Sequence, residues 1–349
     1  MLLEASYKKA QLGEDANPVW SPQLSTAARA MCSSVLSRGL LLAFLAALCH
    51  SSAVPPPPSC KVHEGLHYRH FTCRNFHSLE DFQQIVHDTH SDKPTWFTLW
   101  DSQVPRIPGG AFKDLNVSVL ELRRVHVEHF EPTEGEENPF HGLEQSLHRL
   151  MFSLGTLPTS WSILGHLQHL EELKLIHYKD MHLSNDFNNL PKSVETLYIA
   201  DGTIKKIDDD WLAHLDDLKH LVVRQTDLYN FTRSWLPNPA PHFTTLDLPA
   251  NKLISFPANL DDGLPELKYV SVEKNLITSL HEEDLAPLKD KPVLVDFMFN
   301  PVHCDCKLAF ILDYPTRWHY FLCATPGEVA DRYVTHLTEE QLQCEHSSA

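Results

Sequence analysis

The sequence predicts a solenoid of short parallel strands that stack side by side. Three observations favour it: a recurring apolar phrase, asparagines near the end of that phrase, and cysteines confined to its flanks. The phrase reads apolar, two free positions, apolar, one free position, apolar. We call its middle apolar residues the anchors; they lie 23 to 25 residues apart, at Leu150, Leu173, Leu197, Leu221, Leu246, Val270 and Val295. Because a unit of this length cannot bury its apolar face alone, neighbouring units must share one core.

The last three units carry an asparagine five residues after the anchor, namely Asn251, Asn275 and Asn300. This completes the L-x-x-L-x-L-x-x-N phrase of a leucine-rich repeat. We expect the Asn side chains to bind backbone groups where the chain leaves the strand. The four earlier units have other residues there, which predicts irregular turns at Gly155, Tyr178, Gly202 and Thr226.

Weaker copies of the phrase, anchored on Phe97 and Leu120, extend the pattern toward the N-terminus. The sequence therefore predicts an α/β repeat solenoid, a leucine-rich-repeat horseshoe with about nine parallel strands. The longer interval between Leu120 and Leu150 predicts an acidic loop outside the strands, because insertions in a repeat map to loops. Its acidic residues are Glu131, Glu134, Glu136 and Glu137.

The N-terminus has the features of a secretory leader. A hydrophobic core at residues 39–49 follows Arg38, and Ser51-Ser52-Ala53 is a small-residue cleavage pattern. Because a leader that starts at Met31 has the usual length, we expect translation to begin there. Residues 1–53 are therefore set apart from the fold.

The remaining six cysteines flank the repeats, which predicts disulfide-stapled end caps in an oxidising compartment. We divide the chain into the leader (1–53), an N-terminal cap (54–94), the repeats (95–300), a cysteine-rich C-terminal cap (301–344) and a tail (345–349). In the N-terminal cap we expect a Cys60–Cys73 bridge and a helix capped by Ser78, which shields the first strand. The apolar residues of that helix are Leu79, Phe82, Ile85 and Val86.

Composition and motifs favour an extracellular protein. The formal net charge of −17 repels nucleic acid and anionic lipid. Asn116 and Asn230 each begin an N-x-S/T glycosylation phrase. Because we find no second long apolar stretch, we expect no membrane span and no C-terminal lipid anchor.

The C-terminal cap carries the most specific resemblance. The run Asn300-Pro-Val-His-Cys304-Asp-Cys306-Lys-Leu308, followed by Cys323 and Cys344, resembles the cysteine-rich C-terminal flank of extracellular leucine-rich-repeat proteins. Sequence alone allows three pairings of these cysteines, and the resemblance implies Cys304 with Cys323 and Cys306 with Cys344. The family usually has a tryptophan where this chain has Phe310, and Trp318 comes later.

In overall layout the chain is similar to small secreted arthropod members of that group, such as the non-catalytic leucine-rich subunit of the shrimp luciferase complex. The resemblance implies protein binding without catalysis and without a cofactor. It leaves the identity of the partner open.

Side chains alternate along a strand, so the positions one before, one after and three after each anchor point out of the concave face. Aromatic, Met and Arg residues there predict an interface with a partner protein. The first six strands are mainly basic at these positions, whereas the last three carry Asp247, Glu273 and Asp296. The predicted binding residues are Trp96, Trp100, Arg123, Arg149, Met151, Lys174, Tyr198, Arg224, Tyr269 and Glu273.

Two alternatives stay open at this stage. A soluble pattern-recognition module for microbial or glycan ligands uses the same face. A zinc-dependent hydrolase is the reading of His63-Glu64-Gly65-Leu66-His67, which matches H-E-x-x-H, the helix phrase of zinc proteases. The short Cys60–Cys73 loop and Gly65 disfavour a helix there, although His63, His67, His70 and His77 are also candidates for adventitious metal binding. We expect no enzyme and no metal site.

Overall fold

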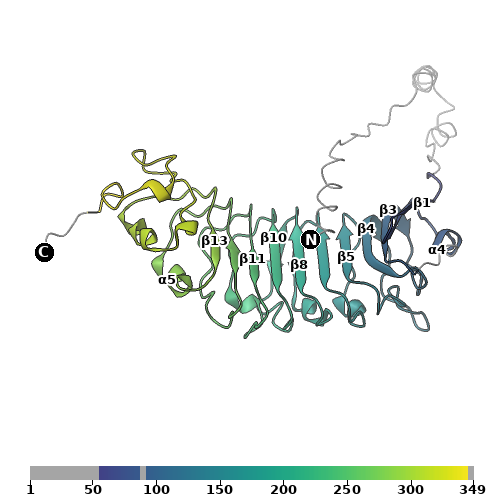
Figure 1. Cartoon of the computed structure of the whole chain (residues 1–349). Coiled ribbons are helices and arrows are strands. Elements are labelled where there is room, and N and C mark those ends of the chain that lie inside the picture. The colour runs from purple at the N-terminus through teal and green to yellow at the C-terminus, as the bar shows by residue number, and fades with distance from the viewer. Residues whose placement is uncertain (1–54, 87–91, 345–349) are drawn as a thin grey trace, which may run out of the picture. The chain divides into compact units, whose positions relative to one another are not determined.

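The computed structural model describes residues 55–86 and 92–344. The strands of its main sheet stand side by side in one ladder, with the chain running from β1 at one end to β13 at the other (Figure 1). The expected leader and the C-terminal tail lie outside the described residues. The signal-peptide prediction therefore stays a prediction.

The main sheet has eleven strands, and every pair from β2 onward is parallel. A second sheet is formed by the connections after β6 and β8. It pairs β7 (Met181–Leu183) with β9 (Ile204–Ile207). In spatial order the main strands are β1 (Ser59–Glu64), β2 (Arg69–Arg74), β3 (Thr95–Val104), β4 (Val117–Val127), β5 (Arg149–Ser153), β6 (Glu172–Ile176), β8 (Thr196–Ala200), β10 (His220–Arg224), β11 (Thr245–Asp247), β12 (Tyr269–Ser271) and β13 (Leu294–Asp296).

The anchors lie opposite one another in register across all nine expected strands. Phe97 faces Leu120, Leu120 faces Leu150, and the series continues without a slip to Val270 facing Val295. Each anchor is at most 1% exposed. The leucine-rich-repeat solenoid is therefore confirmed, with its core built from the apolar phrase.

The N-terminal cap differs from its prediction, because it extends the ladder by two strands. β2 pairs in parallel with β3, placing Phe71 opposite Phe97, and β1 returns antiparallel to β2. Cys60 and Cys73 lie opposite each other across this hairpin and form a disulfide. The physical reason is the alternation from Arg69 to Arg74, which buries Phe71 and Cys73 on one side as in any other repeat strand.

The expected helix of this cap is present as α4 (Leu79–Val86). Ser78 Oγ accepts a hydrogen bond from the backbone N–H of Asp81 at 3.3 Å, which caps the first turn. Phe82 packs edge-on against Phe76 and Phe112, with ring centroids 4.9 and 6.2 Å apart. The helix thus shields aromatic side chains at the start of the core.

The repeat asparagines act as expected where the chain leaves the late strands. Asn275 Nδ2 donates to the carbonyls of Leu248 and Val272, both at 2.9 Å, and its Oδ1 accepts from Leu253 N at 2.9 Å. Asn300 binds the equivalent groups one repeat later, and Asn251 Nδ2 donates to the equivalent carbonyls one repeat earlier. The Oδ1 of Asn251 differs, because it accepts from Thr226 N at 2.9 Å. All three side chains are buried, so each one satisfies polar groups that water cannot reach.

Glycine closes two of the earlier turns by allowing close backbone contact. A Cβ on Gly202 would lie 2.0 Å from the Tyr178 carbonyl oxygen, and one on Gly155 would lie 2.2 Å from that of Val125. The next residue, Thr203, donates its N–H to the same Tyr178 carbonyl at 2.9 Å. The irregular turns therefore bring backbone groups together directly.

One turn position has a backbone conformation that the sequence did not indicate. Ten residues, each four after the aligned apolar residue of strands β2 to β13, have φ between 48° and 66°. None of them is glycine, although this left-handed region costs other residues roughly 1–2 kcal/mol. They are Asn75, Asp101, Arg124, Leu154, His177, Asp201, Gln225, Ala250, Lys274 and Phe299.

Short helical turns occupy the connections between strands. Large aromatic side chains pack one after another along these connections. The ring centroid of Trp161 lies 6.2 Å from that of Phe152 and 5.0 Å from that of Phe187. The ring centroids of Phe187 and Trp211 are 5.2 Å apart. The acidic loop between β4 and β5 contains no strand, as expected, and its Glu136 pairs with Arg106 from the connection between β3 and β4. The remaining helices are η1 (Trp161–Leu164), η2 (Asn185–Asn189), η3 (Arg233–Trp235), α5 (Glu282–Leu285), η4 (Ala286–Leu288), η5 (Cys306–Asp313), η6 (Thr316–Trp318) and η7 (Val334–His336).

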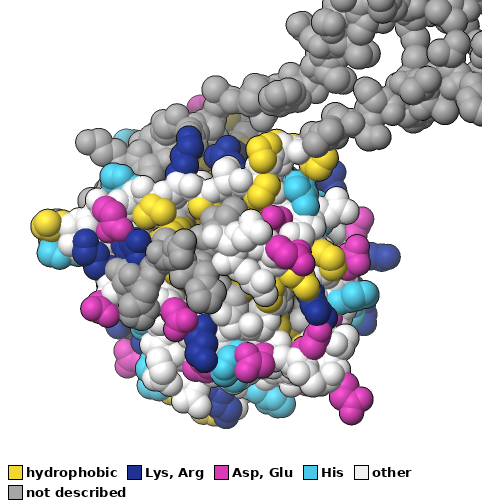
Figure 2. All heavy atoms as spheres, turned by 90° about the vertical axis from the view of Figure 1, so that its right-hand side faces the viewer, with side chains coloured by type: hydrophobic (Ala, Val, Ile, Leu, Met, Phe, Trp, Pro, Cys, Tyr) yellow, Lys and Arg dark blue, Asp and Glu magenta, His cyan; other side chains and the backbone are white. Residues whose placement is uncertain are grey.

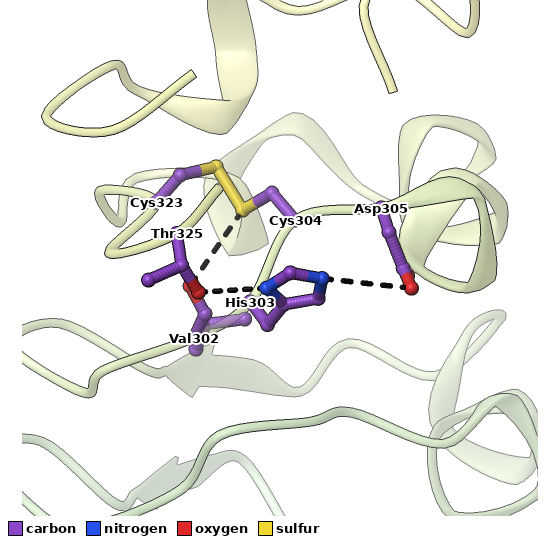
Figure 3. Close-up of a disulfide and its surroundings, with 6 residues drawn as sticks. All are labelled: Val302, His303, Cys304, Asp305, Cys323 and Thr325. Atoms are coloured by element: carbon purple, nitrogen blue, oxygen red, sulfur yellow. Dashed lines mark hydrogen bonds and ion pairs between the residues drawn. A yellow bond between two sulfur atoms is a disulfide. The ribbon is translucent and has the colours of Figure 1, made fainter. Parts of the chain in front are cut away.

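The C-terminal cap closes the other end. Cys304 is bonded to Cys323 and Cys306 to Cys344, the pairing that the family resemblance implied. Beside the first bridge, His303 lies between Thr325 and Asp305 (Figure 3). Trp318 is 1% exposed, and its indole N–H donates to the Val293 carbonyl just before β13 at 3.1 Å. The later tryptophan therefore covers the last strand of the sheet.

Candidate binding face

The outward positions of the strands form three rows across the concave face. The central row, one residue after each anchor, contains only directly paired neighbours. From β3 to β13 it reads Thr98, Glu121, Met151, Lys174, Tyr198, Val222, Asp247, Ser271 and Asp296. Met151 differs from the other predicted binding residues. It is only 5% exposed, so it offers almost no surface to a partner.

Trp100 lies between arginines at the β2 end of the face. In the row three residues after the anchor, Arg74 and Arg123 are its direct neighbours in register. Their guanidinium carbons lie 5.4 and 4.8 Å from the Trp100 ring centroid. Arg124 reaches the same ring at 5.2 Å. These distances are typical of cation–π contacts.

Glu121 is a buried carboxylate beside this cluster. It is 4% exposed and accepts hydrogen bonds from Arg123 Nε at 3.0 Å and Thr98 Oγ1 at 3.4 Å. Burial raises the pKa of Glu121, and the Arg123 charge opposes that shift only in part. Glu121 therefore holds Arg123 in place and adds little free negative charge to the surface.

The middle of the face contains a second group of cations and an aromatic ring. Glu172 pairs with Arg149 at 3.4 Å and with Lys174 at 3.1 Å. Lys174 Nζ also lies 5.4 Å from the centroid of the neighbouring Tyr198 ring. Burial raises the pKa of the Tyr198 hydroxyl, and the Arg224 charge opposes this. Because Glu172 is the shared partner of Arg149 and Lys174, the three side chains together carry a net positive charge.

The β13 end of the face is acidic. Among the residues described, no Lys or Arg forms a salt bridge with Asp247, Glu273 or Asp296. Burial raises the pKa of Asp247; Arg224 lowers it, and the other two carboxylates raise it further. Tyr269 lies half-buried beside them. The predicted basic residues therefore lie on β4 to β10 and the predicted acidic residues on or just after β11 to β13, all on one surface, with Arg224 and Asp247 on adjacent strands.

Two residues of this face escaped the sequence reasoning. Arg74 belongs to β2, which was assigned to the cap and not to the ladder, and Arg124 sits at the left-handed turn position. The sequence signal for β2 is the spacing of Phe71 and Cys73, which matches the last two apolar positions of the repeat phrase. For Arg124 the sequence holds no such signal, because no glycine marks the turn.

The glycosylation acceptors lie outside the parallel strands. Asn116 comes directly before β4, and its Nδ2 donates to the Asp92 carbonyl at 2.9 Å. Asn230 is exposed in the connection after β10. Glycans at either residue remain a prediction.

The H-E-x-x-H phrase does not form a helix. His63 and Glu64 end β1, with His63 opposite His70, and a tight turn follows in which Gly65 N donates to Tyr68 O at 2.9 Å. Glu64 pairs with Arg69 at 2.6 Å. Figure 2 shows this end of the molecule, where acidic, basic and His side chains lie between small hydrophobic patches. The two histidines therefore do not share a helix face as the zinc-protease phrase requires. In residues 55–86 and 92–344, no group of three or more His, Cys, Asp or Glu side chains is placed to hold a metal ion.

Comparisons with known proteins return leucine-rich-repeat proteins. No family model matches the chain. Mouse Toll-like receptor 9 is 26% identical over 156 residues, which are 43% of this chain and 15% of the relative. Rat leucine-rich repeat and fibronectin type-III domain-containing protein 4 is 27% identical over 39% of this chain and 22% of the relative. The matches thus span less than a quarter of these relatives.

Two solved structures are similar at 20% sequence identity. One is a chain from an octameric complex of Latrophilin 3, Unc5D and the leucine-rich repeats of FLRT2; it matches with a TM-score of 0.51 over 72% of this chain and 83% of that chain. The other is human 5T4, with a TM-score of 0.47 over 84% of this chain and 100% of that chain. The described part of the present chain has no helix long and apolar enough to cross a bilayer. The strand ladder and the similarity to the chain from the FLRT2 complex show a leucine-rich-repeat fold with disulfide-bonded caps.

Proposed function

We propose that this chain is an extracellular, non-catalytic recognition or accessory protein that binds a partner protein through its concave face. The observation that carries the proposal is the contact between Lys174 and Tyr198, with Arg224 beside them, on three adjacent strands. All three side chains are partly exposed. Aromatic and Arg side chains of this kind are the residues that dominate binding energy at protein interfaces.

The relatives support a binding role without naming a partner. One of them is named as a receptor, and the leucine-rich repeats of FLRT2 are found in a complex with two other proteins. A likeness to an arthropod accessory subunit also remains a proposal, since the comparisons return other leucine-rich-repeat proteins. Secretion, a start at Met31 and glycans at Asn116 and Asn230 belong to the same proposal.

Affinity capture from extracellular fluid tests the binding role. Immobilised protein is compared with Tyr198→Ala and Arg224→Ala, and with Tyr320→Ala as a control, because Tyr320 is 58% exposed in the C-terminal cap. We expect the two face variants to lose a protein that the control still retains, as identified by mass spectrometry. Equal capture by all four proteins contradicts the proposal. If the retained ligand is a glycan or a microbial product, the chain is instead a pattern-recognition module.

Processing is tested separately by expressing the full chain in secretory cells. We expect a secreted product whose N-terminal sequence begins near Val54 and whose mass falls on treatment with a glycosidase. A mature chain that retains Ser6 or Tyr7 contradicts the predicted leader.

A further inference from the structure

We propose that the Arg74–Trp100–Arg123 stack binds an acidic segment of the partner protein, through Asp or Glu side chains held at the edges of the two guanidinium groups. The proposal rests on the proposed function, because it assigns the chemistry of the partner at one end of the same face. It rests on the contacts around Trp100 and on the distribution of charge along the ladder.

The stack holds the Arg74 guanidinium group beside the ring without using its hydrogen-bond donors, whereas Arg123 also gives its Nε and Nη2 to Glu121. Each approaches the Trp100 ring from a neighbouring strand, at 5.4 Å for Arg74 and 4.8 Å for Arg123. A guanidinium group that lies near an aromatic ring keeps donors free for a carboxylate, which it binds with two parallel hydrogen bonds. The stack therefore pre-organises a site for carboxylates and lowers the entropy lost on binding.

The cluster keeps uncompensated positive charge. Arg123 pairs with Glu121 and Arg124 pairs with Asp101, whereas Arg74 is exposed and, among the described residues, has no carboxylate partner. Three arginines thus face two carboxylates, one of which is buried with a raised pKa. An added carboxylate at Arg74 removes this imbalance.

The rest of the face favours a short acidic segment over a long polyanion. Beyond Arg123 the same row contains Ser153, Ile176 and Ala200, which carry no charge. Arg224 follows in this row, and then Pro249 and the acidic Glu273, while Asp247 lies in the central row. The middle cations Arg149 and Lys174 lie in the other two rows, where Glu172 pairs with both. A sulfated glycan or a nucleic acid needs a continuous run of cations and is repelled by the acidic end. A protein segment fits this charge distribution, because its acidic residues can be confined to the stretch that contacts the arginines.

The test uses two synthetic decapeptides, one of alternating Gly and Glu and the other of alternating Gly and Gln. Binding to the full chain is followed by calorimetry. The change in indole fluorescence on adding peptide is measured in the wild-type chain and in Trp100→Phe, so that the contribution of Trp100 can be separated. We expect only the Glu peptide to bind, with an affinity that falls as salt is added. We expect Arg74→Gln to weaken it by about tenfold, the loss of one charge-assisted pair.

Arg332→Gln is the matched control, because it removes one partly exposed arginine from the C-terminal cap and changes the net charge equally. Equal weakening by Arg74→Gln and Arg332→Gln, or no binding of the Glu peptide to the wild-type chain, overturns the proposal. A heparin-derived decasaccharide that binds more tightly than the peptide and depends on Arg74 also overturns it. If these results coincide with loss of partner capture by Tyr198→Ala, the proposed function stands while the acidic-segment assignment fails.

Discussion

The early repeats, β5 to β10, and the late repeats, β11 to β13, close the same turn in two different ways. In two of the early repeats glycine lets the backbone close the turn directly, as where Gly202 approaches the Tyr178 carbonyl. After β10, the last early strand, the N–H of Thr226 already donates to Asn251 Oδ1. In the late repeats the buried amides of Asn251, Asn275 and Asn300 bind backbone groups. The early strands are five residues long and the late strands three.

This difference determines how much regular surface each half offers. In the early repeats the strand extends to the position three after the anchor, so Arg224 lies in the sheet register. In the late repeats the equivalent residues, Pro249, Glu273 and Met298, come after the strand has ended. The cations of the binding face are therefore held by strand pairing, whereas Glu273 is held by a turn.

The largest effect is expected from breaking a late turn. Asn275→Ala removes the partner of the Leu248 and Val272 carbonyls and of Leu253 N–H, all inside the solenoid. Because buried polar groups left without partners are costly, we expect a loss of about 3 kcal/mol in the free energy of unfolding. Urea denaturation followed by circular dichroism measures it. Asn185→Ala, at an exposed side chain, is the control, and an equal loss in both variants contradicts the role of the amide.

Breaking an early turn should cost somewhat less. Gly202→Ala places a Cβ 2.0 Å from the Tyr178 carbonyl oxygen, so the backbone must move, and we expect a loss of about 2 kcal/mol. Gly327→Ala is the matched control, because nothing lies within 4 Å of its added Cβ. Gly202→Asn should be no better than Gly202→Ala, since its Cβ meets the same oxygen. A stabilising Gly202→Asn would show that the two turn types are interchangeable.

The regular part of the ladder was predictable, and the cap strands were not. Each anchor from Phe97 to Val295 aligned as the spacing required, because one apolar residue per unit must enter the shared core. β2 was missed because only Phe71 and Cys73 carry its pattern, and a disulfide cap already explained the cysteine. Met151 is buried although its position points outward, because side-chain direction alone does not determine how far neighbouring side chains cover a residue.

The acidic end of the face should make stability depend on pH. Burial raises the pKa of Asp247 in the folded chain, so folding favours its protonated form. The stabilisation from this proton is complete below the ordinary Asp pKa and is lost as pH rises through the raised value. We therefore expect Asp247→Asn to become more stable relative to wild type as pH rises across that window. Thermal unfolding at a series of pH values measures this, and a pH-independent difference contradicts it.

The smallest effect concerns the left-handed turn position that both halves share. Gln225 has φ 53°, is exposed, and lies at the last repeat before the asparagine turns begin. Gln225→Gly relieves the cost of this conformation, roughly 1–2 kcal/mol, but gives the unfolded chain more freedom, worth about 0.5–1 kcal/mol. We expect a net gain of about 0.5 kcal/mol in urea denaturation. Gln225→Ala keeps the Cβ and should bring no gain. If Gly and Ala give the same result, the turn is not strained.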